Sequence, residues 1–413
     1  MDARQEKALE IAAKSRIVKR GESYIVPSQS GPNKAYRVEM NPEQPTCTCP
    51  DFEYRLKSCK HIFATEIVIE RERTTVTQTD GEKTVTAITE KVRVTYKQQW
   101  TAYNAAQTQE QSLFQKLLHE LCAPIENPAR SKGRKPLPYS DMLFAAVFKV
   151  YSTMSSRRFA SDLRDARAKG YISHVPHFNS VLNYLESETS TPILYELIAR
   201  ASLPLKALES DFAIDSSGFS THRFVRWFDA KYGKEMTKQQ WIKCHLMCGV
   251  KTNVVTAIEV TQAYTGDSRF FEGLVTQTAQ NFDVAEVSGD KAYSSRANLA
   301  LVKSVGAVPY VPFKSNAIAS GKSAYWDKMF NYYMYRRDEF LAHYHKRSNV
   351  ESTFSMIKRK FGDYVRSKTD TALINETLAK VLCHNICCVI QSMFEFDIVP
   401  TFTDEALTAE KAS

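Results

Sequence analysis

The second half of the chain carries the pattern that most restricts its fold. From residue 211 onward, strand-like runs and helical runs follow one another in a fixed order. Three strand-like runs come first, and after them helices and strands alternate as far as residue 395. We expect strands at 211–220, 241–250, 253–261, 284–290 and 307–313, and helices at 270–282, 294–306, 336–360 and 370–395. Such an alternation predicts an α/β domain whose mixed sheet has helices on its faces.

The order of these elements, β-β-β-α-β-α-β-α, is that of the ribonuclease H-like fold, which we predict for residues 207–396. In this fold the first and fourth strands are neighbours, and the helix after the fifth strand packs against them. Side chains at the ends of those strands and on that helix would therefore meet at one edge of the sheet.

Three carboxylates lie at those places: Asp215 in AIDSSG, Asp290 in VSGDKAY, and Glu351 on the expected helix. Phosphodiester cleavage has to stabilise an attacking and a leaving oxygen in line, which two Mg²⁺ ions about 3.5–4 Å apart can do. Mg²⁺ prefers carboxylate oxygens and keeps several waters, so it needs few protein ligands. Without cations the three acids would repel and raise one another's pKa. The pattern predicts a site for two Mg²⁺, or Mn²⁺, held by these three residues.

Taken singly, each acid has an ordinary structural explanation. An Asp after a strand usually caps a turn or a helix, and a Glu on a helix is usually solvated. Asp267, in TGDSRFFEGL, is the nearest competitor, and we interpret it as a helix N-cap. Asp211 stands at the start of the first strand, away from Asp215, and is expected outside the cluster. The agreement of three positions with one fold favours the catalytic interpretation.

The stretch YHKRSNVESTFSMIK, residues 344–358, places one acid among cations. At about 100° per residue, its polar side chains fall within an arc roughly 60° wide on a helix. The members of this arc are Tyr344, Arg347, Glu351 and Lys358. An apolar stripe lies beside it, formed by Val350, Phe354 and Ile357. The stripe would fix the helix against the sheet and aim Glu351 at Asp215 and Asp290.

Basic residues gather in two segments, 131–170 and 336–368, of a chain whose net charge is +9. The first contains Lys132, Arg134, Lys135, Lys149, Arg157, Arg158, Arg164, Arg167 and Lys169. Two separate basic clusters suit a long polyanion better than a small ligand. Several short helices over 111–206, one of them rich in Arg, are consistent with a DNA-binding unit of helix-turn-helix type, or with a plain helical bundle.

The nine cysteines are of two kinds. Cys47, Cys49, Cys59 and His61 form a C-x-C-x9-C-x-H pattern in a polar stretch, and this set suits tetrahedral Zn²⁺. A site with four protein ligands is closed, which predicts a structural zinc. A chance group of reduced thiols is the alternative. The other cysteines occur in apolar surroundings and are expected to be buried.

The acidic constellation and the 344–358 stretch resemble those of bacterial insertion-sequence DDE transposases. That family carries Tyr, two residues, Arg, three residues, Glu, six residues, Lys, and this sequence repeats the spacing without a gap. AIDSSG and GDKAYSS resemble the family's first and second acidic motifs, and the resemblance covers about 130–395. The cysteine pattern, with CPDF and CKHI around it, is similar to the SWIM-type zinc finger.

The resemblance implies an enzyme that binds terminal inverted repeats, cleaves DNA with metal-activated water and joins the ends to target DNA. It implies that Asp215, Asp290 and Glu351 hold the metals, and that Tyr344, Arg347 and Lys358 contact phosphates or position the transposon end. Tyr344 could equally be a packing residue. Some relatives insert a long β-rich segment that helps to form a DNA hairpin. Here only 60 residues, including a loop with Trp326, separate Asp290 from Glu351, and this departure argues against a hairpin route.

We therefore expect a zinc unit at 1–73, a linker at 74–110, a helical DNA-binding region at 111–206, the catalytic domain at 207–396 and a tail at 397–413. No run approaches the 18 or so apolar residues of a membrane span, and the charged start lacks a signal region, so a cytoplasmic, nucleoid-associated protein is expected. DNA is the expected partner, and the resemblance adds a homodimer across paired ends. A transposase-derived, non-catalytic DNA-binding regulator and a ribonuclease H-like nuclease acting on other substrates are the alternatives.

Overall fold

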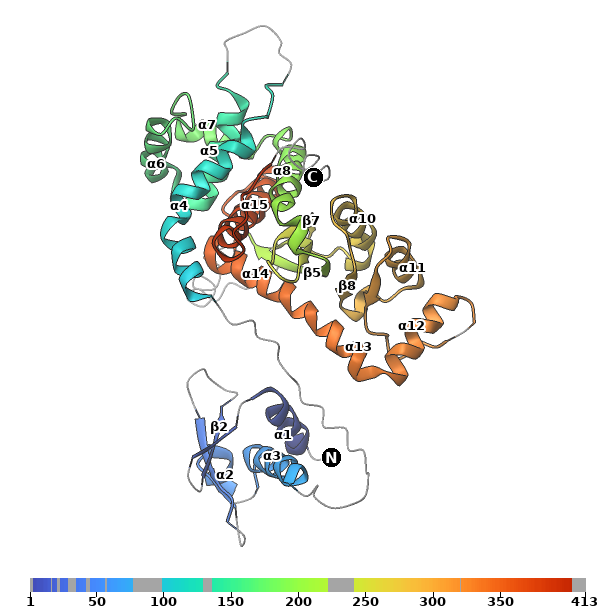
Figure 1. Cartoon of the computed structure of the whole chain (residues 1–413). Coiled ribbons are helices and arrows are strands. Elements are labelled where there is room, and N and C mark those ends of the chain that lie inside the picture. The colour runs from blue at the N-terminus through green and yellow to red at the C-terminus, as the bar shows by residue number, and fades with distance from the viewer. Residues whose placement is uncertain are drawn as a thin grey trace, which may run out of the picture. The chain divides into compact units, whose positions relative to one another are not determined.

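A computed structural model of the chain describes ten stretches of residues. These stretches are 3–15, 17–20, 23–28, 35–41, 45–55, 58–76, 99–128, 136–221, 241–319 and 321–402. The chain divides into two compact units, Met1–Glu90 and Lys91–Ser413 (Figure 1). Most of the predicted linker, 77–98, the basic residues Lys132, Arg134 and Lys135, and most of the predicted tail lie outside the described stretches.

The first unit is a small antiparallel sheet with helices. Its elements are α1 (Ala3–Lys14), β1 (Val18–Arg20), β2 (Ser23–Pro27), β3 (Ala35–Glu39), β4 (Thr46–Cys47), α2 (Pro50–Arg55) and α3 (Lys60–Val76). The strands pair in the order β1-β2-β3-β4. Its buried apolar cluster is small, and Cys47, Cys49 and Cys59 belong to it. A core of this size favours an additional tether such as a metal.

The second unit is built on a five-stranded mixed sheet. Its strands are β5 (Asp211–Ser220), β6 (Trp241–Gly249), β7 (Val255–Gln262), β8 (Glu286–Gly289) and β9 (Val308–Tyr310), in the order β7-β6-β5-β8-β9. β5, β6 and β7 pair antiparallel, whereas β8 and β9 run parallel to β5. The first and fourth strands of the domain are therefore neighbours, and the predicted ribonuclease H-like fold is confirmed.

Helices precede, interrupt and follow the strands. Before the sheet come α4 (Trp100–Cys122), α5 (Tyr139–Ser152), α6 (Ser156–Ala168), α7 (Phe178–Leu185), α8 (Ser190–Ser202) and the 3₁₀ turn η1 (Leu203–Leu208). Within and after it come η2 (Asp267–Phe270), α10 (Phe271–Asn281), η3 (Lys291–Tyr293), α11 (Arg296–Ser304), α12 (Ala324–Tyr335), α13 (Arg337–Tyr344), η4 (His345–Arg347), α14 (Ser348–Phe361) and α15 (Asp370–Glu395).

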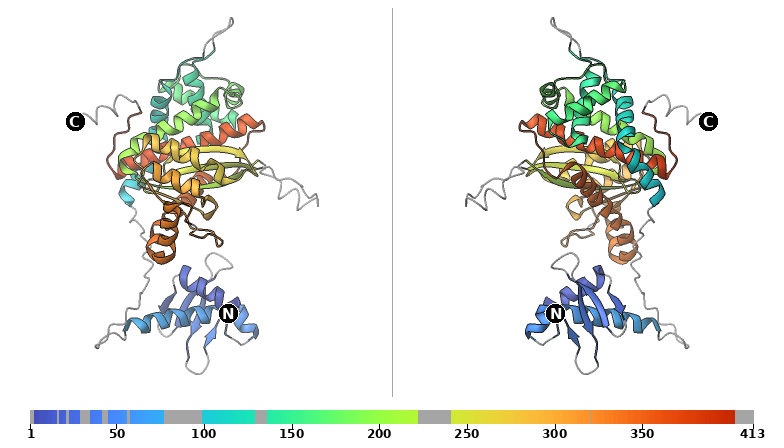
Figure 2. Two further views of the ribbon diagram at one scale, coloured as in Figure 1. Left: turned by 90° about the vertical axis from the view of Figure 1, so that its right-hand side faces the viewer. Right: turned by 90° about the vertical axis from the view of Figure 1, so that its left-hand side faces the viewer.

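The two faces of the sheet are covered by different helices. Side chains of a strand alternate between faces. Phe212 and Ile214 of β5 therefore join an apolar cluster with α10, α11 and α12, whereas Ala213 and Phe219 join another with α14 and α15. Figure 2 shows α15, in red, along one face of the yellow strands. Asp215 shares the alternation of Ala213 and so belongs to the α14 face.

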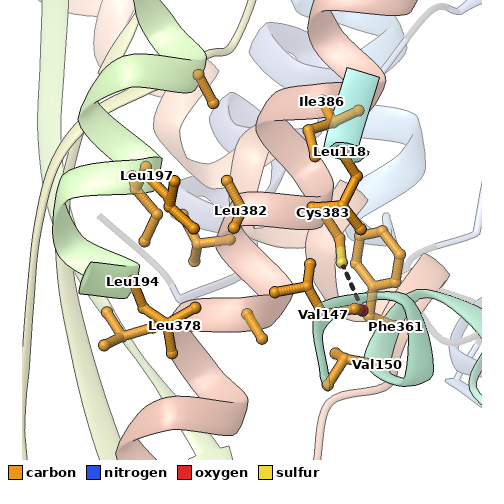
Figure 3. Packing of buried hydrophobic residues seen from close by; sticks show 14 of the residues in the cluster. Leu118, Val147, Val150, Leu194, Leu197, Phe361, Leu378, Leu382, Cys383 and Ile386 are labelled. Carbon is orange, nitrogen blue, oxygen red and sulfur yellow. Dashed lines mark hydrogen bonds between the residues drawn. The ribbon is translucent and has the colours of Figure 1, made fainter. Parts of the chain in front are cut away.

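The helix α15 is the centre of the larger core. Figure 3 shows its apolar side chains between those of α4, α5, α8 and α14, with labels on Leu118, Val147, Leu194, Leu197, Phe361, Leu378, Leu382 and Ile386. The thiol of Cys383 donates to the Val147 carbonyl at 3.6 Å. By length and composition α15 could cross a membrane, but 83% of its most apolar window is buried in the fold, as in the core helix of a globular domain. The expectation that no segment has the length and composition of a membrane span was therefore wrong for α15.

Two details of the predicted elements differ from the structure. The helix expected over 336–360 is divided, because α13 ends at Tyr344 and a 3₁₀ turn, His345–Arg347, precedes α14. Tyr344 and Arg347 therefore do not lie on the α-helix that carries Glu351 and Lys358. Trp326, expected in a loop, lies on α12, where Ser323 caps the helix by accepting from its N–H.

Candidate functional site

Asp215 and Asp290 lie next to one another where the pairing between β5 and β8 stops. Asp290 directly follows β8, whereas Asp215 lies within β5 and not, as its sequence context predicts, at the end of the strand. The register pairs Ile214 of β5 with Gly289 of β8, and each aspartate is the next residue along its strand. Glycine is required at 289, because a Cβ there would lie 2.9 Å from Ile214 Cγ2. Asp290 begins η3 by accepting from the N–H of Ala292, and Oδ1 of Asp215 accepts from the Ser216 N–H at 2.8 Å.

Glu351 faces this edge from α14. Three buried side chains of α14 pack in the core cluster that contains Ala213 and Phe219 of β5, and these are Val350, Phe354 and Ile357. The predicted apolar stripe is thus what holds α14 on the sheet. The Glu351 side chain is 58% exposed and remains accessible to a ligand.

Arg347 connects two of the three acids. Its Nη1 donates to Oδ2 of Asp215 at 2.6 Å, and its Nη2 donates to Oε1 of Glu351. Burial raises the pKa of Asp215; the Ser216 amide and Arg347 lower it, and the charges of Asp290 and Glu351 raise it again. All three carboxylates are therefore close enough to interact electrostatically. This burden of negative charge is what a bound divalent cation would relieve, and carboxylates are the ligands that Mg²⁺ and Mn²⁺ prefer. Among the described residues the three acids are not gathered as tightly as the four residues of the predicted zinc site, and Arg347 occupies two of the acids.

Lys358 and Tyr344 take different positions around the acids. The ammonium of Lys358 donates to Ser217 Oγ at 2.7 Å, two residues beyond Asp215 on β5. Burial lowers the pKa of Lys358. Tyr344 packs against the apolar cluster of the α10 face, and the Arg347 guanidinium lies 6.0 Å from its ring centroid. Packing is thus the contact observed for Tyr344.

A cavity opens between β5 and α14 beside the acids. It has a volume of about 530 Å³, and Asp215 and Glu351 line it together with Phe354, Lys358 and Arg359. Carboxylates and cations thus share one surface. Such an arrangement can hold metal ions and the phosphates of a nucleic acid strand next to one another.

Asp267 is not the helix N-cap that its sequence context predicts. Its Oδ1 accepts from Ser216 Oγ at 2.8 Å and lies 2.5 Å from Lys243 Nζ and 3.3 Å from His245 Nδ1. Burial opposes its ionisation, but the hydrogen bonds from Lys243 and Ser216 hold the pKa of Asp267 below its ordinary value. Because Ser216 follows Asp215, this cluster lies on the opposite face of the sheet and fixes β5 behind Asp215.

Asp211 lies outside the acidic cluster, as expected. Its Oδ2 accepts from Lys346 Nζ at 2.7 Å, and the same ammonium lies 2.7 Å from Glu286 Oε2.

No local pattern in the sequence indicates the Asp267 cluster, whose members come from β5, β6 and η2. The cluster could be found only from the register that brings Ser216 opposite His245, and this register is known only once the strand pairing is known.

Cys47, Cys49, Cys59 and His61 form a compact buried cluster. Their ligand atoms all lie within 4.8 Å of one another, and among the described residues this is the one such group of three or more metal-binding side chains. Nδ1 of His61 lies 4.0 Å from Cys47 Sγ and 3.8 Å from Cys59 Sγ, close to the ~3.6 Å that tetrahedral Zn²⁺ bonds imply. A shared thiol hydrogen bond raises the pKa of Cys47 and lowers that of Cys59. The set fits Zn²⁺, which takes thiolates and neutral imidazole.

The remaining cysteines agree with the sequence interpretation. Cys122, Cys244, Cys248, Cys383 and Cys388 are buried, and Cys387 is half-buried. Burial raises the pKa of these thiols. They serve as small apolar side chains rather than as ligands.

Comparison with known families gives two matches. Residues 206–386 match the family described as Transposase DDE domain, and residues 36–70 match the SWIM zinc finger. The first match contains Asp215, Asp290 and Glu351, and the second contains the four residues of the Cys/His cluster. No curated protein matches the chain.

Proposed function

This protein carries a DDE transposase domain and an N-terminal SWIM zinc finger, and from that premise we propose that it is an active transposase. It binds the terminal inverted repeats of a transposon, cleaves at the ends and joins them to target DNA. The observation that supports catalysis most strongly is the parallel register of β5 and β8, which brings Asp215 and Asp290 together beside Glu351.

Asp215, Asp290 and Glu351 are the residues that hold the divalent cations in this proposal. Bound Mg²⁺ or Mn²⁺ supplies a water of lowered pKa and stabilises the attacking and leaving oxygens of an in-line displacement. Arg347 is already linked to two of the acids and can turn its guanidinium to a phosphate oxygen. Lys358, anchored at Ser217, holds a second phosphate along the cavity. Tyr344 positions Arg347 by packing beside it.

The helical region before the sheet provides a second surface for DNA. On α6 the apolar side chains Phe159, Leu163 and Ala166 are buried. The opposite side of the helix exposes basic residues, and these are Arg157, Arg158, Arg164 and Arg167, followed by Lys169. We assign this face to phosphate contacts along the transposon end, within the predicted DNA-binding region 111–206. Action as a homodimer across paired ends, in the cytoplasm at the nucleoid, belongs to the same proposal.

Zinc in the first unit is structural in this proposal. All four ligands of the cluster come from the protein, and a closed tetrahedral site leaves no position for water or substrate. His61 Nε2 is buried, and among the described residues it has no hydrogen-bond partner. Its Nδ1, by contrast, faces Cys47 and Cys59 as a ligand would.

The deciding experiment is cleavage of DNA that carries the inverted repeats flanking the gene, with purified protein and Mg²⁺. Asp290→Asn removes a metal ligand and should lower the cleavage rate at least a hundredfold while end binding persists. Asp283→Asn is the matched control, because Asp283 is exposed just before β8, and it should cleave like the wild type.

Two other results would reassign the protein. Binding without cleavage by the wild type would indicate the non-catalytic regulator. Cleavage without strand-transfer products in a joining assay would indicate a nuclease of other substrates. If Asp290→Asn cleaves as fast as the wild type, the assignment of the acids is wrong.

A further inference from the structure

A second cavity, of about 270 Å³, opens just beyond the acidic site, where η3 leads into α11. Three consecutive residues, Ser294–Arg296, line one side, and the segment after β9 together with α12 lines the other. The full lining is Ser294, Ser295, Arg296, Lys314, Asn316, Ala317, Ile318 and Trp326. These residues, all within the described stretches, comprise two cations, hydroxyl and amide groups and an indole, and no carboxylate.

The hydroxyl of Ser294 is the feature of this cavity that ordinary packing does not explain. Ser294 is 7% exposed, and its Oγ has no hydrogen-bond partner within the part of the chain that the structure describes. A buried hydroxyl without a partner is costly, and native proteins rarely keep one. Ser294 lines the cavity, and rotation of its side chain about χ1 would give the hydroxyl a ligand in the cavity as its partner.

The start of α11 lies beside the same cavity, because Ser295 and Arg296 line it. Ser295 accepts from the Asn298 N–H at 3.1 Å, so this N–H is already paired. The start of a nine-residue helix also carries the positive end of the helix dipole, which favours an anion nearby.

One of the two cations, Arg296, is held in place by an aromatic side chain. The Arg296 guanidinium lies 5.3 Å from the ring centroid of Trp326, whose indole N–H donates to the Ile318 carbonyl at 3.0 Å. Trp326 thereby supports Arg296 across the cavity mouth, and Lys314 approaches from the segment after β9. A fixed guanidinium, an ammonium, a buried hydroxyl and a helix N-terminus together select a tetrahedral oxyanion.

We propose that this cavity binds a backbone phosphate of the transposon DNA, a contact that rests on the proposed function. Ser294 is four residues from Asp290, so their Cα atoms are at most ~14 Å apart. Each strand of B-DNA carries a phosphate every ~3.4 Å of helix axis. The bound phosphate therefore lies within about four nucleotides of the cleaved bond. It fixes the register of the strand against Asp290.

Salt-dependent binding of a labelled duplex to the full-length protein tests the contact. Lys314→Gln should lower the slope of log affinity against log salt by about one, as expected for one lost phosphate contact. Ser294→Ala should weaken binding roughly fivefold. Lys303→Gln is the matched control: it removes the same charge from the far end of α11, beside Tyr325 and outside the cavity, and should leave the slope unchanged.

Inorganic phosphate separates DNA from a free anion as the ligand. In the proposed mode, phosphate competes with the duplex at the wild-type cavity and no longer does so in Ser294→Ala. If Lys314→Gln and Ser294→Ala bind the duplex as tightly as Lys303→Gln does, the proposal is overturned. The proposal is also overturned if phosphate binding depends on Ser294 but the salt slope of DNA binding is unchanged in Lys314→Gln. The cavity would then be a site for a free anion. Loss of cleavage in Asp290→Asn, run in parallel, tests the proposed function separately.

Discussion

Arg347 donates to Oδ2 of Asp215 at 2.6 Å, and its other terminal nitrogen donates to Glu351. One cation of the chain thus neutralises two of the three carboxylates to which we assign metal binding. This contact lowers the pKa of Asp215, against the burial that raises it. If these carboxylates hold a divalent cation, as we propose, the cation would compete with Arg347 for their oxygens, and the displaced guanidinium would be available to a DNA phosphate.

Arg347→Gln should therefore have opposite effects on metal binding and on cleavage. Mn²⁺, followed through the electron paramagnetic resonance signal of the free ion, should bind about fivefold more tightly, because it no longer competes with a charge-assisted hydrogen bond worth ~1 kcal/mol. Cleavage at saturating Mn²⁺ should fall at least tenfold, since a phosphate contact is lost.

Lys346→Gln is the matched control for Arg347→Gln. Lys346 is the preceding residue and pairs with Asp211 and Glu286, away from Asp215. The Lys346→Gln substitution removes the same charge as Arg347→Gln but should leave the affinity for Mn²⁺ unchanged. Weaker Mn²⁺ binding in Arg347→Gln would contradict the competition, and an equal gain in both variants would reduce it to a general effect of net charge.

The proximity of Asp215 and Asp290 was predictable because the signals are local. Both lie beside apolar residues that mark a strand, and the order of elements makes those two strands neighbours. The sequence did not show that β5 continues past Asp215 as a strand, rather than as a turn, to Ser220. The break between Tyr344 and Ser348 was not predictable, because 336–360 contains no glycine or proline. Asp267 was missed for another reason: its partners on β5 and β6 reach it only through cross-strand register.

His245 makes the stability of the second unit sensitive to acid. Burial lowers its pKa to about 4, Asp267 acts in the opposite direction, and Lys243 lowers it further. Nε2 of His245 lies 3.0 Å from Thr261 Oγ1, and Phe270 packs on its ring. A histidine whose folded pKa lies below the unfolded value of 6.5 contributes full stability above pH 6.5, and this is lost as the pH falls towards 4.

Between pH 7 and pH 5 the difference between the folded and unfolded pKa values of His245 removes about 2 kcal/mol from the free energy of unfolding. Urea denaturation at the two pH values should show that His245→Gln loses that much less than the wild type. His174→Gln serves as the control, because His174 is exposed, and it should retain the acid sensitivity of the wild type. Equal losses in the wild type and His245→Gln would show that His245 is not the group responsible.

Glu110 joins the helical region to the helix that carries Glu351. Its Oε1 accepts from the Tyr151 hydroxyl at 2.8 Å, and its Oε2 accepts from Lys360 on α14. The Glu110 side chain is only 11% exposed, so Glu110→Ala leaves a cation and a hydroxyl without their partner. We expect a loss of about 3 kcal/mol in the free energy of unfolding, measured by urea denaturation.

The exposed ion pair on the same helix provides the contrast. Lys116 and Glu120 of α4 lie 3.9 Å apart with side chains 61% and 42% exposed, so Glu120→Ala should cost less than about 0.5 kcal/mol. Similar losses in the two variants would mean that the contact between α4 and α14 stabilises the fold no more than a surface pair does.

Zinc should be needed for the fold of the first unit, because the apolar cluster there is small and three of its members are the cysteines themselves. Metal analysis should find about one zinc per chain, and Cys47→Ser with Cys49→Ser should remove it. The first unit of that double variant should then be digested rapidly by protease, while the second unit, with its own larger core, stays intact. Cys387→Ser, which changes a half-buried thiol of the second unit, should keep both the zinc and the protection. An unchanged zinc content in the double variant would exclude Cys47 and Cys49 as ligands. If the zinc is lost but the first unit still resists the protease, the metal binds there without supporting the fold.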